Sequence, residues 1–288
     1  MILSFGGLLA LELRLFSLSL ILCLAAFFAS PFGVREAQLL ILAYHHVDDA
    51  GGETTISLST FDSHLSALTE NGFSFVGFDD VISFVEGRSP LPERPVCIVF
   101  DDGYLSNYSL AFPVLLKHGA KATFCVIGSA VGHDRYKDTD RKVIPHFSWE
   151  QAREMTSMGL ISIGSHTFDM HMHPEYEGGA VREYAVPLSG ESVADFESAF
   201  RIDCERMSRL MAENLGQKPL VFAYPHGVWD GISEQVLKEH GYRVTLTTEA
   251  GYNTVSVGNA DCLYLLKRYS VNDSTHILDI IEAFNTKN

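Results

Sequence analysis

The sequence is poor in basic residues. It carries 21 lysine and arginine residues against 36 aspartate and glutamate residues, so its formal net charge is −15 over 288 residues. Binding to the phosphate backbone of nucleic acid needs a basic footprint, and this composition argues against a nucleic-acid-binding protein. The apolar share of 47% is enough for a sizeable core and argues against a disordered chain.

Cysteine is also scarce, and its spacing fits neither a zinc-thiolate site nor a disulfide framework. No two cysteines form a CxxC pair, and most lie within apolar stretches, so we expect small core side chains. The Rossmann glycine pattern and the Walker phosphate loop are missing as well, which removes the nucleotide-binding sites that those patterns identify. The five cysteines are Cys23, Cys97, Cys125, Cys204 and Cys262.

A long uncharged run lies near the N-terminus. Residues 15–34, LFSLSLILCLAAFFASPFGV, contain no charge and follow Arg14. A run of this length approaches what a membrane span needs, and a basic residue before an apolar segment is typical of a secretory signal. We therefore expect residues 1–34 to be a signal peptide or a membrane anchor. The remainder, 35–288, would then be extracytoplasmic, either secreted or anchored, although a buried N-terminal helix is the alternative.

Beyond residue 38, apolar runs of strand length alternate with segments of helical period. Most runs are continuously apolar, as expected for strands buried on both faces of a parallel sheet. The alternation predicts one α/β domain with parallel strands, either a barrel or an open doubly wound sheet. The expected strands are 39–44, 96–100, 122–127, 160–164, 220–224 and 243–247. The first expected helix is capped by Ser59 or Thr60 and ends near residues 71–72, and three others cover 149–159, 193–215 and 230–240. A long loop is expected at 172–192.

Polar residues that can take part in catalysis or metal binding directly follow four of the expected strands. In a parallel barrel, strand ends of one sense meet on one face, and catalytic groups gather there. A purely structural role would scatter such residues over both ends of the strands, so we expect one site on this face. The four places are His45 with His46, Asp101 with Asp102, the segment SHTFDMHMH at 165–173, and PHG at 225–227.

His166 and His171 are candidate metal ligands. Their separation of five residues does not stack both rings on one helix face, but a loop can point both at one ion. With a carboxylate they would form a two-histidine, one-carboxylate site that leaves positions open for water. Asp102 can supply that carboxylate, and Asp101 can then accept a proton from the attacking water. Gly103 allows the sharp turn that this requires, while an Asx turn with a helix N-cap is the alternative.

Such a reaction also needs an acid for the leaving group and a donor for an oxyanion. His45 or His46 can be the acid, because imidazole titrates near neutral pH. The backbone N–H of His226, between Pro225 and Gly227, is free to point at an oxyanion.

The motifs FDDGY at 100–104, SHTFDMH at 165–171 and FAYPHG at 222–227 resemble, in this order, those of the polysaccharide deacetylases, carbohydrate esterases with a NodB-like domain. AYHHV at 43–47 is similar to the segment that carries the acid histidine in poly-N-acetylglucosamine deacetylases. The resemblance covers about residues 39–285. It implies a single domain, 35–288, with a distorted (β/α) barrel of fewer than eight regular strands, which hydrolyses N-acetyl groups on a sugar polymer and releases acetate.

The same resemblance implies a role for each site residue. It implies a divalent metal, most often Zn²⁺, bound by Asp102, His166 and His171, with Asp101 as base, His45 as acid, and the His226 N–H as oxyanion donor where the family often has tyrosine.

The chain departs from the family pattern before Pro225, where many members carry an arginine that orients the base. The stretch LVFAYP has none. We hypothesise that Arg268 approaches Asp101 from another strand, with a surface arginine as the alternative. Tyr104 and Trp229 offer aromatic faces that can stack on a sugar ring, although a core or rim position is an equal expectation.

Two other functions remain open from the sequence. One is a membrane-tethered glycan-binding protein that has lost turnover, against which the presence of all the expected ligands, base and acid speaks. The other is an amidase or esterase of the same fold that acts on a small molecule. The expected partner is an N-acetylglucosamine polymer or a cell-wall glycan, not a nucleic acid.

Overall fold

The computed structural model describes residues 35–179 and 181–286, and the structure below is that of these residues. The signal or anchor expected at 1–34 lies outside them. Within the described ranges, no helix combines the length and the apolar character that crossing a bilayer requires. The chain from Glu36 onward forms one compact unit.

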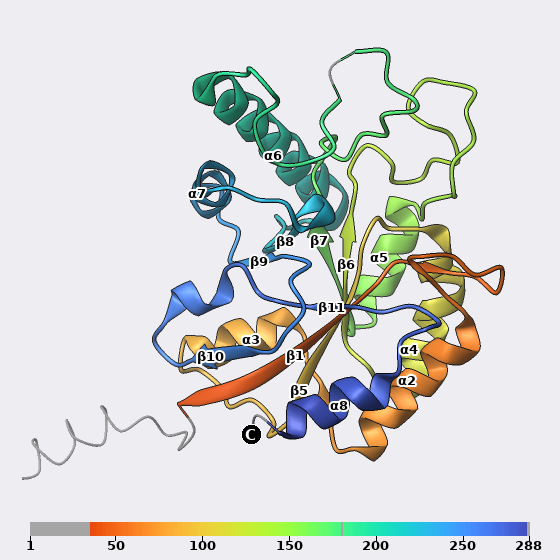
Figure 1. The fold of residues 1–288 in the computed structure, drawn as a ribbon, viewed down its shortest axis with the longest axis vertical. Helices are drawn as coiled ribbons and strands as arrows, with labels where there is room; N and C mark the ends of the chain where they lie inside the picture. Colours follow the sequence, from red (N-terminus) through yellow and green to blue (C-terminus); the bar gives the residue numbers. More distant parts are fainter. Residues whose placement is uncertain (1–34, 180, 287–288) are drawn as a thin grey trace, which may run out of the picture. The chain divides into compact units, whose positions relative to one another are not determined.

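A nine-stranded sheet occupies the centre of this unit (Figure 1). Its order is β10-β1-β5-β6-β7-β8-β9, with β4 paired to β5 and β11 paired to β1. All pairings are parallel except that of β10 with β1, and β2 with β3 forms a separate parallel pair. The strands are β1 Glu36–Tyr44, β2 His46–Val47, β3 Thr55–Ile56, β4 Ser74–Phe75, β5 Pro95–Phe100, β6 Ala122–Val126, β7 Ile161–Ser165, β8 Val221–Ala223, β9 Val244–Leu246, β10 Asn253–Ser256 and β11 Tyr269–Ser270.

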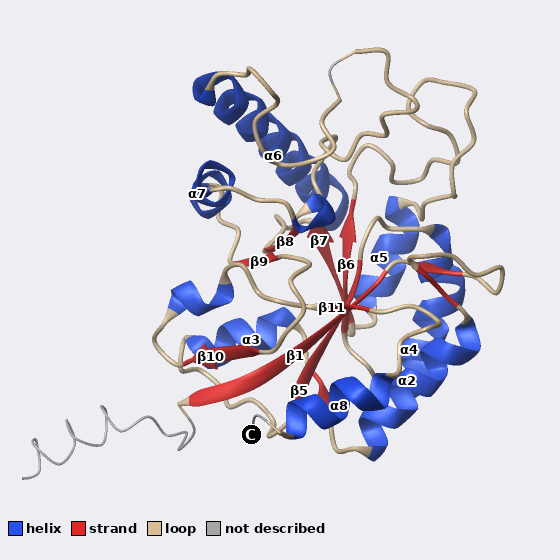
Figure 2. Ribbon diagram, viewed as in Figure 1, coloured by secondary structure: helices blue, strands red, loops and turns tan. Residues whose placement is uncertain are grey.

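Helices surround the strands, and long loops without helix or strand extend from one end of the sheet (Figure 2). The helices are α2 Leu58–Glu70, α3 Phe78–Val85, α4 Phe112–His118, α5 Trp149–Ser157, α6 Val193–Leu215, α7 Gly231–Glu239 and α8 Ile277–Asn285, with short η1 Asn107–Ala111, η2 Pro225–Gly227 and η3 Ala260–Leu263.

Both faces of the central strands are covered, which explains their unbroken apolar sequences. Leu40 and Leu42 of β1 enter the cluster that holds α2, α4, α5 and α8. Leu39 and Ile41, pointing the other way, enter the cluster that holds α3. The four cysteines within the described residues are free, and all but Cys262 are buried.

The six expected strands are present, each within three residues of its expected bounds. The start expected for the first helix is wrong: Ser57, two residues before Ser59, is the N-cap, and its side chain accepts from the Thr60 N–H. Strands β2, β3, β4, β10 and β11 were missed because runs of two to four residues show no periodicity. The loop expected at 172–192 contains no helix or strand among its described residues.

One irregular segment, residues 264–271, links β9, at one end of the strand order, with β1, the strand next to the other end. It pairs with β9 through Leu266 and with β1 through β11. Arg268 lies between these two pairings. The sheet is thus a curled half-barrel with this bridging segment across its gap, which confirms the distorted barrel and not the open doubly wound sheet.

Candidate active site

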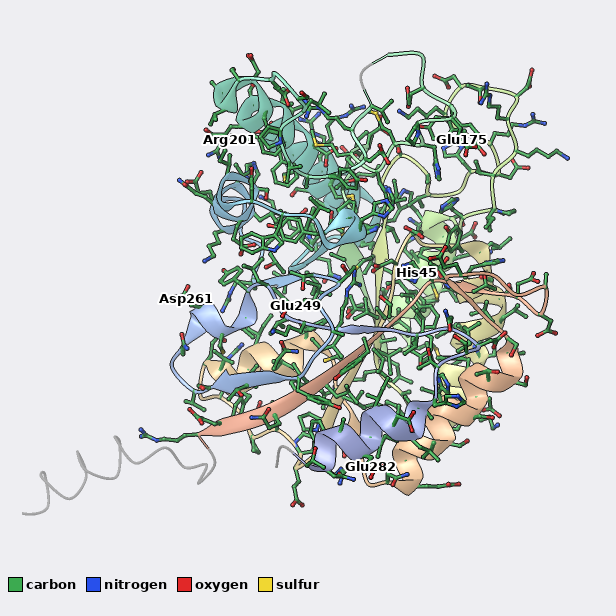
Figure 3. All side chains as sticks on the ribbon, in the orientation of Figure 1. His45, Glu175, Arg201, Glu249, Asp261 and Glu282 are labelled. Carbon is green, nitrogen blue, oxygen red and sulfur yellow. The ribbon has the colours of Figure 1, made fainter. Side chains whose placement is uncertain are left out.

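The residues that follow the parallel strands line one cavity of about 580 Å³. Its wall comes from the loops after β1, β5, β6, β7, β8 and β9 and from the bridging segment, and Figure 3 labels His45 at the end of β1. The expected convergence at one end of the sheet is therefore observed. Of the expected site residues, His45, Asp101, Asp102, Tyr104, His166, His171, His226 and Arg268 line the cavity.

Three atoms that can bind a metal, one each from Asp102, His166 and His171, lie within 4.8 Å of one another. Asp102 Oδ1 is 3.6 Å from His166 Nε2 and 3.7 Å from His171 Nε2. A tetrahedral zinc ion with ligands at about 2.0–2.2 Å separates its ligand atoms by about 3.4 Å. Asp102 Oδ1 is also buried without a hydrogen-bond partner among the described residues, which is costly unless a cation binds there. The donor set therefore fits a divalent cation.

Both histidines present Nε2 to Asp102. His166 Nδ1 lies 2.7 Å from the carbonyl oxygen of Ala223. A carbonyl only accepts, so Nδ1 donates, and Nε2 is the ring atom that faces Asp102 and can bind a metal. Burial, followed by the neighbouring His166, lowers the pKa of His171 to about 3, which keeps its ring neutral.

The acidic pair is presented by a turn with left-handed backbone. Asp102 has φ of 69° and Gly103 has φ of 84°. A Cβ at Gly103 would lie 2.9 Å from Val126 Cγ1 of β6, so only glycine fits at this close approach. An aspartate with a left-handed backbone costs conformational energy, and residues in such conformations often occur at functional sites. This turn brings Asp101 and Asp102 into the same cavity although they are adjacent in the chain.

Asp101 forms a buried bidentate pair with Arg268. Arg268 Nη1 donates to Asp101 Oδ1 at 2.8 Å, and Nη2 lies 2.7 Å from Oδ2. Arg268 Nε donates to the Thr247 carbonyl at 2.7 Å, which fixes the guanidinium plane. Burial alone would raise the pKa of Asp101, but Arg268 together with the nearby His166 and His45 outweighs burial and holds this pKa well below its usual range. This is the approach hypothesised from the sequence, and Arg268 is 1% exposed, so it is not a surface arginine.

The structure separates the two adjacent histidines after β1. His45 lines the cavity, with Nε2 at 3.8 Å from Asp101 Oδ2. His46 has its Nδ1 at 2.8 Å from Ser106 Oγ and its Nε2 at 3.8 Å from Asp48 Oδ2. His46 is not among the cavity-lining residues of the described chain. Of these two histidines, His45 is therefore the one within reach of the acidic pair.

His226 lies in the turn η2 with φ of 53°. Its carbonyl accepts from Thr248 Oγ1 at 3.1 Å, and a Cβ at the next residue, Gly227, would lie 2.5 Å from the Thr248 nitrogen. The turn is therefore packed tightly against the loop after β9. The His226 ring centroid lies 4.9 Å from that of His171, and burial, followed by the nearby His166, lowers the pKa of His226. Its role as an oxyanion donor stays a prediction.

The two aromatic residues expected to contact a sugar are placed differently. Tyr104 lines the cavity, with its ring 5.3 Å from that of His46 and 5.1 Å from that of His146. Trp229 is 44% exposed and is not among the described residues that line the cavity. The next residue, Asp230, is the N-cap of α7. A contact between Trp229 and a substrate therefore stays a prediction.

Sequence reasoning missed one wall of the cavity, built by the loop after β6 and the loop after β7. Tyr136 and Tyr176 both line the cavity, and their ring centroids are 5.0 Å apart. Tyr136 donates to Glu177 Oε1 at 2.5 Å and thereby joins the two loops. No motif marks these residues, and the only signal was the length of chain without a periodic pattern.

The chain is similar to known deacetylases. The family profile described as "Polysaccharide deacetylase" matches residues 88–245. The poly-beta-1,6-N-acetyl-D-glucosamine N-deacetylase of Escherichia coli (strain K12) is 28% identical over 233 residues, which are 75% of this chain and 34% of that protein. This chain thus spans about a third of the length of that relative.

Two solved structures share the fold. A de-N-acetylase from Aggregatibacter actinomycetemcomitans superposes with a TM-score of 0.74 at 24% identity, covering 85% of this chain and 99% of that one. IcaB from Ammonifex degensii superposes with a TM-score of 0.67 at 30% identity, covering 82% of this chain and 92% of that one.

Proposed function

Because the chain belongs to the polysaccharide deacetylase family, we propose that it removes N-acetyl groups from an N-acetylglucosamine-containing polysaccharide outside the cytoplasm. The substrate named for the Escherichia coli relative, a poly-β-1,6-N-acetylglucosamine, supports this class of polymer. The observation that carries the proposal is the pairing, in one cavity, of a compact Asp-His-His set with a second carboxylate held ionised by arginine. Secretion or anchoring through residues 1–34 belongs to the same proposal.

Asp102, His166 and His171 would hold a divalent cation. Two imidazoles and one carboxylate with open positions suit Zn²⁺. When bound, such a cation acts as a Lewis acid toward water and toward the acetyl carbonyl.

The chain's own residues would handle the protons. Asp101, ionised beside Arg268, takes a proton from the attacking water. His45 then gives a proton to the departing amine, so that acetate and a free amino sugar leave. The backbone N–H of His226 stabilises the negative charge that develops on the acetyl oxygen.

The experiment that tests this function measures acetate release by the Zn²⁺-loaded protein from N-acetylglucosamine polymers and from peptidoglycan. We expect release from a polymer, loss of release with a chelator, and recovery when Zn²⁺ is restored. Release only from small N-acetylated or ester substrates would favour the small-molecule amidase or esterase. A protein with a full complement of metal that releases no acetate from any of these substrates would not be a deacetylase.

Replacing His166 by alanine should remove a metal ligand. Loss of an outer-shell partner alone typically lowers metal affinity about 10- to 100-fold, and loss of a ligand should cost at least as much. Metal content after dialysis and titration with Zn²⁺ would measure this. His173→Ala is the matched control, because His173 lines the same cavity outside the ligand set. Unchanged metal stoichiometry in His166→Ala would remove His166 from that set.

Replacing His45 by alanine should lower kcat by about 10²- to 10⁴-fold, the usual contribution of an acid or base, with bound metal retained. His46→Ala is the control, because His46 contacts Ser106 and Asp48 instead of the acidic pair. Steady-state acetate release and metal content would be measured for both variants. If His46→Ala loses turnover and His45→Ala does not, the acid is the other histidine.

A further inference from the structure

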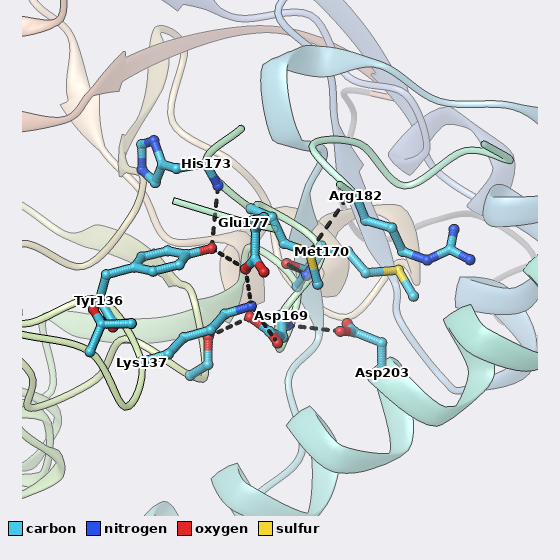
Figure 4. A network of polar contacts seen from close by, with 12 residues as sticks. Tyr136, Lys137, Asp169, Met170, His173, Glu177, Arg182 and Asp203 are labelled. Carbon is cyan, nitrogen blue, oxygen red and sulfur yellow. Dashed lines mark hydrogen bonds and ion pairs between the residues drawn. The ribbon is translucent and has the colours of Figure 1, made fainter. Parts of the chain in front are cut away.

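The loop that carries the two histidine ligands is held by a buried carboxylate that the reaction above does not use. Asp203 lies in α6 and is 5% exposed. The Phe168 N–H donates to Asp203 Oδ2 at 2.7 Å. The Asp169 N–H donates to Asp203 Oδ1 at 2.8 Å, and Figure 4 shows Asp203 facing Asp169. Both donors lie between His166 and His171 in the chain.

We propose that Asp203 is a positioning residue that fixes the loop between His166 and His171 in the geometry that binds the metal. The inference rests on the proposed function, because it assumes that these two histidines are ligands.

The loop has no helix or strand to define its path, so its hydrogen bonds must do so. Thr167 has φ of 73°, which turns the chain so that the next two N–H groups meet one anion. The Met170 N–H donates to Thr167 Oγ1 at 3.0 Å, which closes the turn. Asp203 therefore satisfies the two N–H groups at the middle of this turn.

The opposite side of the loop is held by the chain after β6. The N–H groups of Gly128 and Ser129 donate to the carbonyls of Thr167 and Phe168 at 3.0 and 2.8 Å. The Asp169 side chain accepts from Ser129 Oγ at 3.1 Å, and Lys137 Nζ lies 3.2 Å from its other oxygen. The loop is thus held between α6 and the β6 loop. From α6, the Arg206 guanidinium also lies 4.0 Å from the Phe168 ring centroid, but Asp203 is the residue that accepts the two backbone N–H groups.

The charge state of Asp203 suits this role. Burial raises its pKa to about 6, against which the two backbone donors act. At neutral pH the group therefore accepts both hydrogen bonds as a carboxylate. In Asp203→Asn the amide oxygen can accept one N–H, but the amide NH₂ would face the other and leave it unsatisfied.

Metal sites tolerate ligand displacements of only about 0.2 Å. Movement of the segment that joins two ligands therefore lowers the affinity for the metal, even when the overall fold is retained. We expect Asp203→Asn to weaken Zn²⁺ binding by about 10- to 100-fold, as loss of outer-shell partners does. Activity should return toward the wild-type value at saturating Zn²⁺, since no group that touches substrate has changed.

The test is Zn²⁺ titration against a chromophoric chelator, performed on the whole chain. Glu205→Gln removes an equal charge from an exposed position of the same helix, and we expect its Zn²⁺ Kd to be that of the wild type. Met211→Ala removes buried packing from α6, so it should lower Tm without changing Kd. An Asp203→Asn protein that binds Zn²⁺ within about twofold of the wild type would overturn the inference, since outer-shell loss normally costs more.

Two further outcomes are informative. A wild-type protein that binds no Zn²⁺ would overturn the proposed function itself, which is a different failure. If Asp203→Asn does not fold, amide hydrogen exchange of the metal-free wild type tests whether Asp203 holds the loop. The Phe168 and Asp169 amides should exchange slowly before any metal is added, and exchange at the rate of unprotected amides would refute the positioning role.

Discussion

Asp101→Asn should lower kcat by about 10²- to 10⁴-fold, the range that a general base contributes. An amide cannot take the proton that the carboxylate would accept from water. Bound metal should be retained, because Asp101 is not one of the three clustered ligand atoms. Acetate release at saturating substrate, together with metal content, would measure both effects.

Glu53→Gln is the matched control for Asp101→Asn, because it removes an equal charge from an exposed residue of the same cavity wall. Its turnover should stay close to that of the wild type. Near-normal turnover of Asp101→Asn with a full complement of metal would refute the assignment of the base.

Arg268→Met should move the rising limb of the pH profile of kcat/KM to higher pH. In the wild type, the guanidinium holds the pKa of Asp101 low despite burial. Without it, burial outweighs the remaining influence of His166 and His45, and the pKa should rise above the usual value of about 3.9. Initial rates from pH 4 to pH 9 would show the shift.

The same variant should lose about 3–5 kcal/mol of unfolding free energy at neutral pH, because it leaves a buried carboxylate without its partner. The wild-type pKa of Asp101 is depressed on folding, so the pair stabilises the protein above the unfolded pKa of about 3.9 and less as pH falls below it. In Arg268→Met the folded pKa is raised instead, so stability should fall as pH rises from about 4. Denaturant unfolding at several pH values would measure both slopes.

Arg243→Met is the control for this pair. Arg243 forms a partly exposed ion pair with Glu86, with the Nη2 to Oε1 distance of 2.8 Å. Surface pairs contribute about 0–1 kcal/mol, so the variant should lose little stability and keep the pH profile of the wild type. If Arg268→Met also keeps that profile, the arginine does not set the ionisation of Asp101.

The strand ends and the metal-ligand candidates could be predicted because their signals are local. The run VCIVF is apolar throughout since β5 is buried on both faces, and the paired aspartates follow it at once. The expected family was correct for the same reason, because its motifs are short and lie next to strands. Helix bounds were predicted well where caps and apolar spacing agreed, as for α6.

The remaining features depend on contacts between distant parts of the chain. Arg268 and Asp101 are 167 residues apart in the sequence. Strand β11, which directly follows Arg268 and pairs with β1, has only two residues. The aromatic wall at Tyr136 and Tyr176 lies in loops without periodicity. Asp203 differs, because it lies three residues after Phe200 and four before Met207, on the apolar face of α6. A stricter count of that face would have indicated a buried carboxylate.

Because Arg268 lies in the bridging segment, its ion pair with Asp101 can form only after the last part of the chain has been synthesised. At about 5–20 residues per second, ribosomal synthesis would deliver Arg268 roughly 8–33 s after Asp101, given the 167 residues between them. Until then Asp101 lacks the guanidinium that favours its ionised form. A protease cut just before the bridging segment would leave the Asp-His-His set and His45 on one fragment and Arg268 on the other, joined only by non-covalent contacts.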